Sequence, residues 1–119
     1  MAVAGGRRIL IVEDELLIGM LLEDMLVELG YQVAGSASRV EDALKLASET
    51  ELDAAILDVN LHGKEIYPVA DVLAGRKIPF LFATGYGERS LPSAFRQRPT
   101  LQKPFQQETL QAKLADLFI

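Results

Sequence analysis

Five polar residues follow aliphatic runs of the sequence and have the types that phosphoryl chemistry requires: Glu13, Asp14, Asp58, Thr84 and Lys103. Carboxylates gathered in one crevice repel each other and raise each other's pKa unless a cation neutralises them. Ligands that offer only oxygen select a hard divalent ion such as Mg²⁺. An aspartate beside Mg²⁺, with an ammonium and a hydroxyl opposite, could attack phosphorus and hold the charge of a transferring phosphoryl group. The expected product is an aspartyl phosphate.

These residues need a scaffold that brings distant parts of the chain together, and the apolar pattern predicts one. Runs that are apolar at nearly every position are typical of strands buried on both faces of a sheet. We expect strands at 9–12, 31–37, 54–57, 79–84 and 100–102. Apolar residues at helical spacing alternate with these runs and predict helices at 16–29, from about 39 to 47, around 66–75, and from 110 to the C-terminus. Ser38 and Glu41 have the spacing of a capping box before the second helix.

The alternation of strands and helices gives five β/α units and predicts an α/β fold with an open, doubly wound parallel sheet. The fourth helical segment, Ser90–Phe95, contains Pro92 and is expected to be short or mobile. Functional residues in such sheets gather at the carboxyl ends of the strands. All five polar residues lie at the end of a predicted strand, so we expect them to project into one crevice.

The composition narrows the function classes. The chain has 119 residues, a formal net charge of −5 and no cysteine. This length suits one domain, which we expect at residues 8–119 after a loose tail of residues 1–7. The absence of cysteine excludes disulfide scaffolds, zinc ribbons and thiol nucleophiles and favours the cytoplasm. The net charge argues against nucleic-acid binding, and no uncharged run exceeds 10 residues, about half of the ~20 that a membrane-spanning helix needs.

Four segments resemble the response-regulator receiver domains of two-component signalling: Ile9–Glu15, Ala55–Leu61, Ile78–Tyr86 and Leu101–Phe105. The resemblance covers residues 8–119. It implies a flavodoxin-like receiver fold, with a five-stranded parallel sheet in strand order 2-1-3-4-5. Phe80–Tyr86 also looks like the variant receivers that carry a Phe-Ala-Thr-Gly-Tyr motif and are common as single-domain regulators in alphaproteobacteria.

The resemblance also implies a role for each polar residue. Asp58 would accept the phosphoryl group, Thr84 would sense it and Lys103 would pair with it. The ligands of Mg²⁺ would be Asp14 directly, Glu13 through water, Asp58, and Asn60 through its backbone carbonyl. The donor would be a histidine kinase or a histidine phosphotransfer protein, and an unidentified downstream protein would bind the phosphorylated form. The chain would be a monomer or weak homodimer that catalyses only its own phosphorylation and dephosphorylation.

The sequence departs from the receiver pattern in ways that concern the switch. Most receivers carry Tyr or Phe three residues before the lysine, where this chain has the small Thr100. We therefore expect Tyr86, flanked by glycines, to act with Thr84 as the switch, and the segment Glu88–Arg98 to become ordered when Asp58 is phosphorylated. The loop after Asp58 lacks the common Met-Pro, and the spacing of 26 residues from Asp58 to Thr84 is slightly short, which affects the expected shape of the third helix.

Other interpretations remain open from the residues themselves. Glu13-Asp14-Glu15 alone is typical of a helix start, and any one of the other polar residues alone could be a turn or surface residue. A Mg²⁺-dependent phosphohydrolase would share the sheet and the nucleophile, but Asn60 stands where those enzymes carry a second Asp. A nucleotide- or flavin-binding domain would need glycines in the turn after the first strand, which is acidic here. A degenerate receiver that acts only by binding would not need the intact set.

Overall fold

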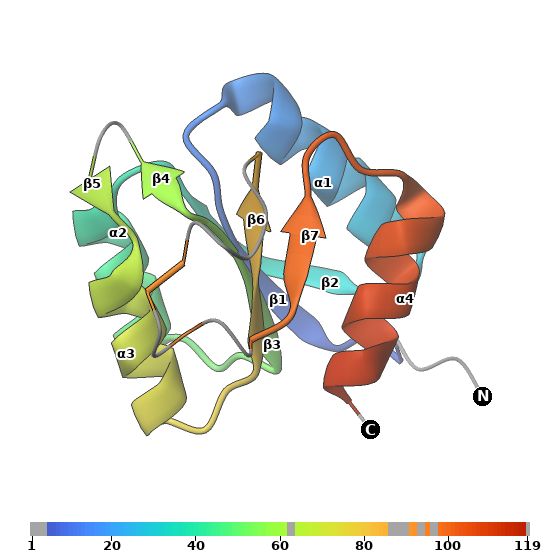
Figure 1. Cartoon of the computed structure of the whole chain (residues 1–119). Helices are drawn as coiled ribbons and strands as arrows, with labels where there is room; N and C mark the ends of the chain where they lie inside the picture. Colours follow the sequence, from blue (N-terminus) through green and yellow to red (C-terminus); the bar gives the residue numbers. More distant parts are fainter. Residues whose placement is uncertain (1–4, 62–63, 86–90, 93–94, 96–97, 119) are drawn as a thin grey trace.

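The computed structural model describes residues 5–61, 64–85, 91–92, 95 and 98–118. Its centre is a parallel five-stranded sheet in the order β2-β1-β3-β6-β7, which is the predicted order 2-1-3-4-5 (Figure 1). The strands are β1 (Arg8–Val12), β2 (Gln32–Ala37), β3 (Ala54–Asp58), β6 (Phe80–Thr84) and β7 (Thr100–Gln102). The predicted fold class is therefore confirmed.

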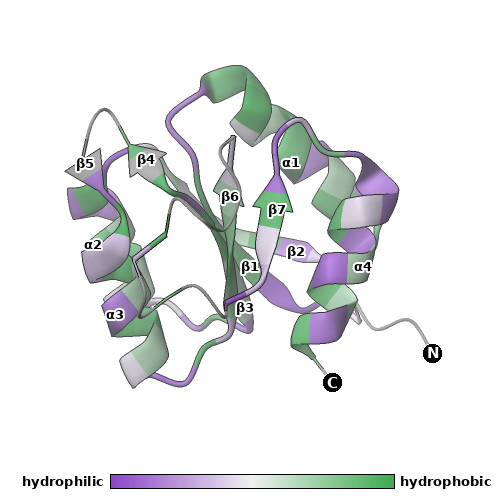
Figure 2. Cartoon of the chain, in the orientation of Figure 1, coloured by the Kyte–Doolittle hydropathy of each residue, from purple (hydrophilic) through white to green (hydrophobic). Residues whose placement is uncertain are grey.

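In the part of the chain that the structure describes, two helices cover each face of the sheet (Figure 1). They are α1 (Leu16–Glu28) and α4 (Gln107–Leu117) on one face, and α2 (Val40–Glu49) and α3 (Tyr67–Gly75) on the other. Successive strand residues point to opposite faces, so Ile9 and Ile11 pack towards α1 and α4 while Leu10 and Val12 pack towards α2 and α3. This double coverage explains why β3 and β6 are buried throughout and apolar up to their last residue (Figure 2).

The strand register brings the carboxyl ends of the strands level with each other. Val12 of β1 lies beside Leu57 of β3, so the residues that follow, Glu13 and Asp58, are neighbours across the sheet. Asp58 in turn lies beside Ala83 of β6. The order of strands reverses between β1 and β3, which is where doubly wound sheets place their crevice.

Three details differ from the sequence-based expectations. The second helix begins at Val40 as expected, but its N-cap residue is Arg39, whose side chain makes no capping hydrogen bond, so the cap is not at Ser38, where the capping box placed it. The loop after Asp58 contains an unexpected antiparallel pair, β4 (Asn60–Leu61) and β5 (Lys64–Glu65). Gly6, placed in the expected tail, donates its backbone N–H to the Gly30 carbonyl at 3.1 Å. The fold therefore begins before Arg8.

Further expectations concern the third and fourth helices and the absence of a membrane-spanning segment. Half of Ser90–Phe95, the fourth helical segment expected from the sequence, lies outside the described residues. The third helix ends at Gly75, as expected, and has Pro68 in its first turn. Within the part of the chain that the structure describes, no helix is both long and apolar enough to span a membrane.

Candidate functional site

The carboxyl edge of the sheet brings the five predicted polar residues to one place. Glu13 extends the ladder of β1 by donating its N–H to the Ala37 carbonyl at 3.0 Å, and Val59 extends β3 by donating to the Ala83 carbonyl at 3.1 Å. Lys103 follows β7 and donates its N–H to the Thr84 carbonyl at 2.9 Å. The same backbone ladders that build the sheet thus fix where these side chains begin.

Three carboxylates form the centre of the site. Glu13, Asp14 and Asp58 each offer one oxygen, and these oxygens lie within 4.8 Å of one another. Glu13 and Asp58 are buried, with 5% and 6% of their surface exposed, whereas Asp14 is half-buried. Like charges this close, two of them shielded from water, repel strongly unless a cation offsets them.

Lys103 supplies a cation at the site. Its Nζ lies 2.9 Å from Glu13 Oε2 and 3.2 Å from Asp58 Oδ2, and it donates a hydrogen bond to Glu13 Oε1 at 3.2 Å. Burial alone would lower the pKa of Lys103. Its hydrogen bond with Glu13 and the charges of Asp58 and Glu13 outweigh burial and raise that pKa. Lys103 is therefore charged at neutral pH.

One ammonium does not compensate the buried carboxylates fully. The pKa of Glu13 rises from 4.5 to about 7, mainly because the side chain is buried and then because it shares a hydrogen bond with Asp58. The hydrogen bond from Lys103 acts in the opposite direction but does not prevail. Glu13 therefore carries its charge at a cost that a further cation would relieve.

The donor set fits Mg²⁺. All three side chains offer only oxygen, and Glu13 Oε2, although close to Lys103, is buried and accepts no hydrogen bond from the described residues. Asn60, expected to contribute its backbone carbonyl, begins β4 two residues after Asp58. Its role as a ligand remains a prediction.

Of the two predicted switch residues, the structure describes Thr84 but not Tyr86. Thr84 ends β6 with only 3% of its surface exposed, at the strand end beside the carboxylates. Tyr86 and most of Glu88–Arg98 lie outside the described residues. Thr84 is thus brought to the site, while the expectation for Tyr86 stays a prediction.

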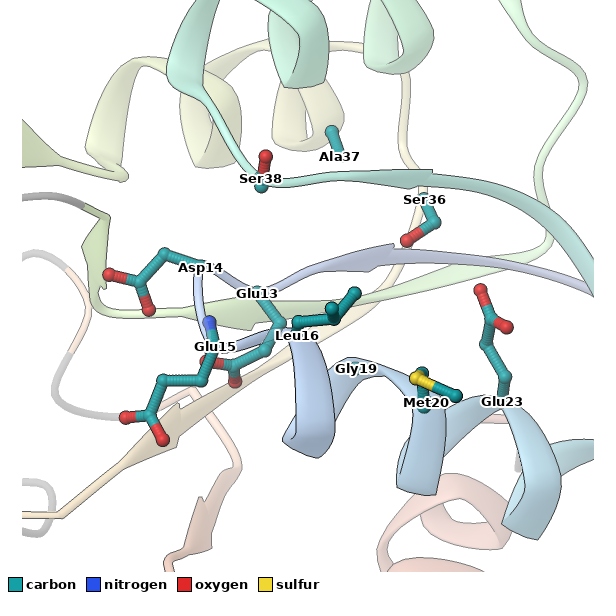
Figure 3. Close-up of a pocket in the computed structure, with 10 residues that line it drawn as sticks. All are labelled: Glu13, Asp14, Glu15, Leu16, Gly19, Met20, Glu23, Ser36, Ala37 and Ser38. Carbon is teal, nitrogen blue, oxygen red and sulfur yellow. Dashed lines mark hydrogen bonds between the residues drawn. The ribbon is translucent and has the colours of Figure 1, made fainter.

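A pocket of about 330 Å³ opens beside the carboxylates, between the first turns of α1 and the end of β2 (Figure 3). Its lining combines four acidic side chains, two serines and the apolar Leu16 and Met20. Leu16 and Leu17 are more than three-quarters exposed, at 76% and 79%. Sequence analysis missed this pocket. The only sequence signal was that the first turn of α1 has more apolar residues than one buried face requires.

Comparison with known proteins identifies a family and a similar solved structure. Residues 9–115 match the family described as response regulator receiver domain. The chain is similar to SdrG from Sphingomonas melonis Fr1, whose solution structure has a TM-score of 0.86 and 48% sequence identity over 100% of both chains.

Two curated relatives are longer. PdtaR, a transcriptional regulatory protein of Mycobacterium tuberculosis, is 36% identical over 103 residues, which are 83% of this chain and 50% of that protein. The phyllosphere-induced regulator PhyR of Methylorubrum extorquens is 38% identical over 112 residues, 90% of this chain and 42% of that protein. The chain therefore spans about half the length of these curated relatives.

Proposed function

Because the chain belongs to the response regulator receiver domains, we propose that it is a phosphorylation-controlled switch whose acceptor is Asp58. The observation that carries the proposal is the arrangement around this carboxylate. Asp58 lies 3.2 Å from the Lys103 ammonium and within the cluster of oxygens shared with Glu13 and Asp14. Glu13 shares these surroundings, but Asp58 is itself the last residue of its strand, β3, at the centre of the sheet.

The proposed reaction moves a phosphoryl group from a phosphohistidine to Asp58. An Asp58 carboxylate oxygen attacks phosphorus in line, the O–P bond forms while the N–P bond breaks, and the leaving imidazole takes up a proton. Lys103 would hold the negative charge of the phosphoryl oxygens, and Thr84 would donate its hydroxyl hydrogen to one of them. Mg²⁺, held by Glu13, Asp14, Asp58 and the Asn60 carbonyl, would neutralise charge on the carboxylates and the phosphoryl oxygens.

The proposed partners follow from the same chemistry. The donor is a histidine kinase or a histidine phosphotransfer protein, and the output is contact with a downstream protein or further transfer of the phosphoryl group. The acidic net charge of −5 is unsuited to a nucleic-acid target. We keep the cytoplasm as the proposed compartment.

Incubation with Mg²⁺ and acetyl phosphate tests the function. Intact-mass measurement should find one added phosphoryl group on the wild type and none on Asp58→Asn. Asp53→Asn is the matched control, because Asp53 is an exposed carboxylate just before the same strand, and it should be labelled like the wild type. Equal labelling of Asp58→Asn would refute the proposal, and repeated turnover of a phosphomonoester would favour a phosphohydrolase instead.

Tyr86 remains the proposed partner of Thr84 in the switch. Amide hydrogen exchange over residues 85–98, with and without beryllofluoride and Mg²⁺, tests this role, since beryllofluoride mimics a phosphoryl group on Asp58. Protection should rise in the wild type and fail to rise in Tyr86→Ala, with Asp58 still modified. The same protection in both states of the wild type would contradict the ordering of this segment.

A further inference from the structure

Four of the chain's eight aromatic residues gather on one face of the sheet, around the strand that ends at Thr84. Phe82 of β6 is fully buried and is the hub of this group. Its ring centroid lies 5.4 Å from Phe80, 6.1 Å from Tyr67 and 5.6 Å from Phe95, each time edge to face. Thr84 is two residues further along the strand and therefore faces the same side.

Tyr67 and Phe95 also stack on each other. Their centroids are 5.4 Å apart and their planes differ by 11°, an arrangement in which aromatic rings attract each other beyond the effect of burial. Both side chains are only half-buried, unlike Phe80 and Phe82. The stack is therefore the part of the aromatic group that reaches the surface.

The two stacked rings come from different connections of the sheet. Tyr67 begins α3, at the end of the connection that starts at Asp58 and contains β4 and β5. Phe95 belongs to the connection between Thr84 and β7, and it is fixed there by local contacts. Its N–H donates to the Pro92 carbonyl at 2.9 Å, and its own carbonyl accepts from the Arg98 N–H at 3.0 Å.

The guanidinium of Arg98 packs on Phe80, at the other end of the aromatic group, and lies 4.7 Å from the centroid of that ring. A cation over an aromatic face is attracted by the ring's quadrupole. Leu91, with 2% of its surface exposed, packs into the same core. Among the described residues of the connection after Thr84, Leu91, Phe95 and Arg98 thus contact the core on this face of the sheet.

From this geometry we propose that the Tyr67–Phe95 stack couples the site to the surface between α3 and β7, with Tyr67 as a positioning residue. The stack joins the connection that leaves Asp58 to the connection that leaves Thr84, and it rests on Phe82 between them. A phosphoryl group on Asp58 that draws Thr84 and Lys103 towards it moves the starts of both connections. The stack converts that movement into tighter packing of Phe95 and Arg98. The inference rests on the proposed function.

Amide hydrogen exchange of Phe95 and Arg98 tests the coupling, because it reports opening of the backbone hydrogen bonds and is insensitive to ring currents. With Mg²⁺ and beryllofluoride, both amides should exchange more slowly in the wild type. Tyr67→Leu should lose this slowing while Asp58 is still modified, as intact mass after acetyl phosphate treatment reports. Tyr67→Phe keeps the ring and should respond like the wild type.

A matched control separates coupling from general loss of packing. Phe118 is half-buried like Phe95, but it packs in the core on the opposite face of the sheet. Its ring centroid lies 6.3 Å from that of Tyr31. Phe118→Leu should therefore keep the response of the Arg98 amide, whereas Phe95→Leu should lose it. Phe95→Leu also serves if Tyr67→Leu does not fold.

The outcomes distinguish the coupling from the proposed function. If beryllofluoride changes the exchange of Asp58, Thr84 and Gly85 but not that of Phe95 and Arg98, the switch stands and the coupling is wrong. A full response in Tyr67→Leu or Phe95→Leu would also overturn it. If nothing changes at Asp58 and mass detects no phosphoryl group, the proposed function fails, and the coupling fails with it.

Discussion

The two edges of the central sheet use charged residues in opposite ways. At the amino edge, Arg8 and Asp53 fasten β1 to the start of β3: the Arg8 N–H donates to Asp53 Oδ2 at 2.7 Å, and Arg8 Nε donates to the Glu51 carbonyl at 2.8 Å. These contacts are exposed, and water screens the charges. At the carboxyl edge, Glu13 and Asp58 are buried against each other, with the Lys103 ammonium between them. The comparison indicates that the amino edge stabilises the fold, while the carboxyl edge holds repulsion that a cation and a phosphoryl group can use.

Removing the cation at each edge should give the largest contrast. Lys103→Met leaves two buried carboxylates without their ammonium, and breaking a buried ion pair typically costs about 3–5 kcal/mol of unfolding free energy. Arg8→Met removes one exposed hydrogen bond and should cost about 1 kcal/mol. Urea denaturation without divalent ions at about pH 8, where the carboxylates are charged, measures both. Similar losses in the two variants would remove the distinction between the edges.

The second contrast is in pH dependence. The pKa of Glu13 is raised from 4.5 to about 7 in the folded chain, so the folded state keeps a proton that the unfolded state releases. Without Mg²⁺, the contribution of Glu13 to the free energy of unfolding should therefore be greatest below pH 4.5. This contribution should fall as the pH rises towards about 7, by on the order of 3 kcal/mol. The raised pKa of Lys103 lies above this window and does not oppose the trend.

Urea denaturation in EDTA at about pH 5.5 and about pH 8 measures this dependence. Glu13→Gln should lose most of it, while Glu51→Gln, at the exposed amino edge, should keep it. Adding Mg²⁺ should stabilise the wild type more at the higher pH, because the metal requires deprotonated carboxylates. A wild-type stability that rises over this range without Mg²⁺ would contradict the raised pKa of Glu13.

The smallest contrast comes from the same substitution at each edge. Asp14→Ala removes one of three crowded carboxylates and should raise stability without Mg²⁺ by about 1 kcal/mol, the scale of repulsion between unit charges about 4 Å apart in water. It should also abolish the stabilisation by Mg²⁺. Asp53→Ala should instead lower stability, because it removes the acceptor of the Arg8 N–H. Thermal melts with and without Mg²⁺ measure both signs, and a lower melting temperature for Asp14→Ala in EDTA would contradict the account.

Much of this architecture was predictable from local pattern. Buried parallel strands have to be apolar on both faces, so the runs at β1, β3 and β6 and the polar residues that end them could be recognised directly. The convergence of Glu13, Asp58 and Lys103 then followed from the parallel topology. Residue types and strand ends together therefore predicted which side chains meet.

What the sequence did not predict depends on contacts that have no local pattern. β4 and β5 are two residues each, too short for any periodicity, and their pairing after Asp58 is a tertiary outcome. The capping box failed because Arg39 took the cap position in extended backbone. The stack of Tyr67 on Phe95 joins residues 28 positions apart that neither spacing nor motif connects. The pocket beside Asp14 is likewise formed by the meeting of α1 and β2.

Asp58, and no other carboxylate of the carboxyl edge, is proposed to accept the phosphoryl group. Borohydride reduces an aspartyl phosphate to homoserine and leaves free carboxylates unchanged. The most direct test is therefore to treat the wild type with acetyl phosphate and Mg²⁺, reduce it, and map the peptides by mass spectrometry. We expect homoserine at position 58, and none when Mg²⁺ is replaced by EDTA. Homoserine at Asp14 or Asp53, or unmodified Asp58 in a protein whose intact mass shows a phosphoryl group, would contradict it.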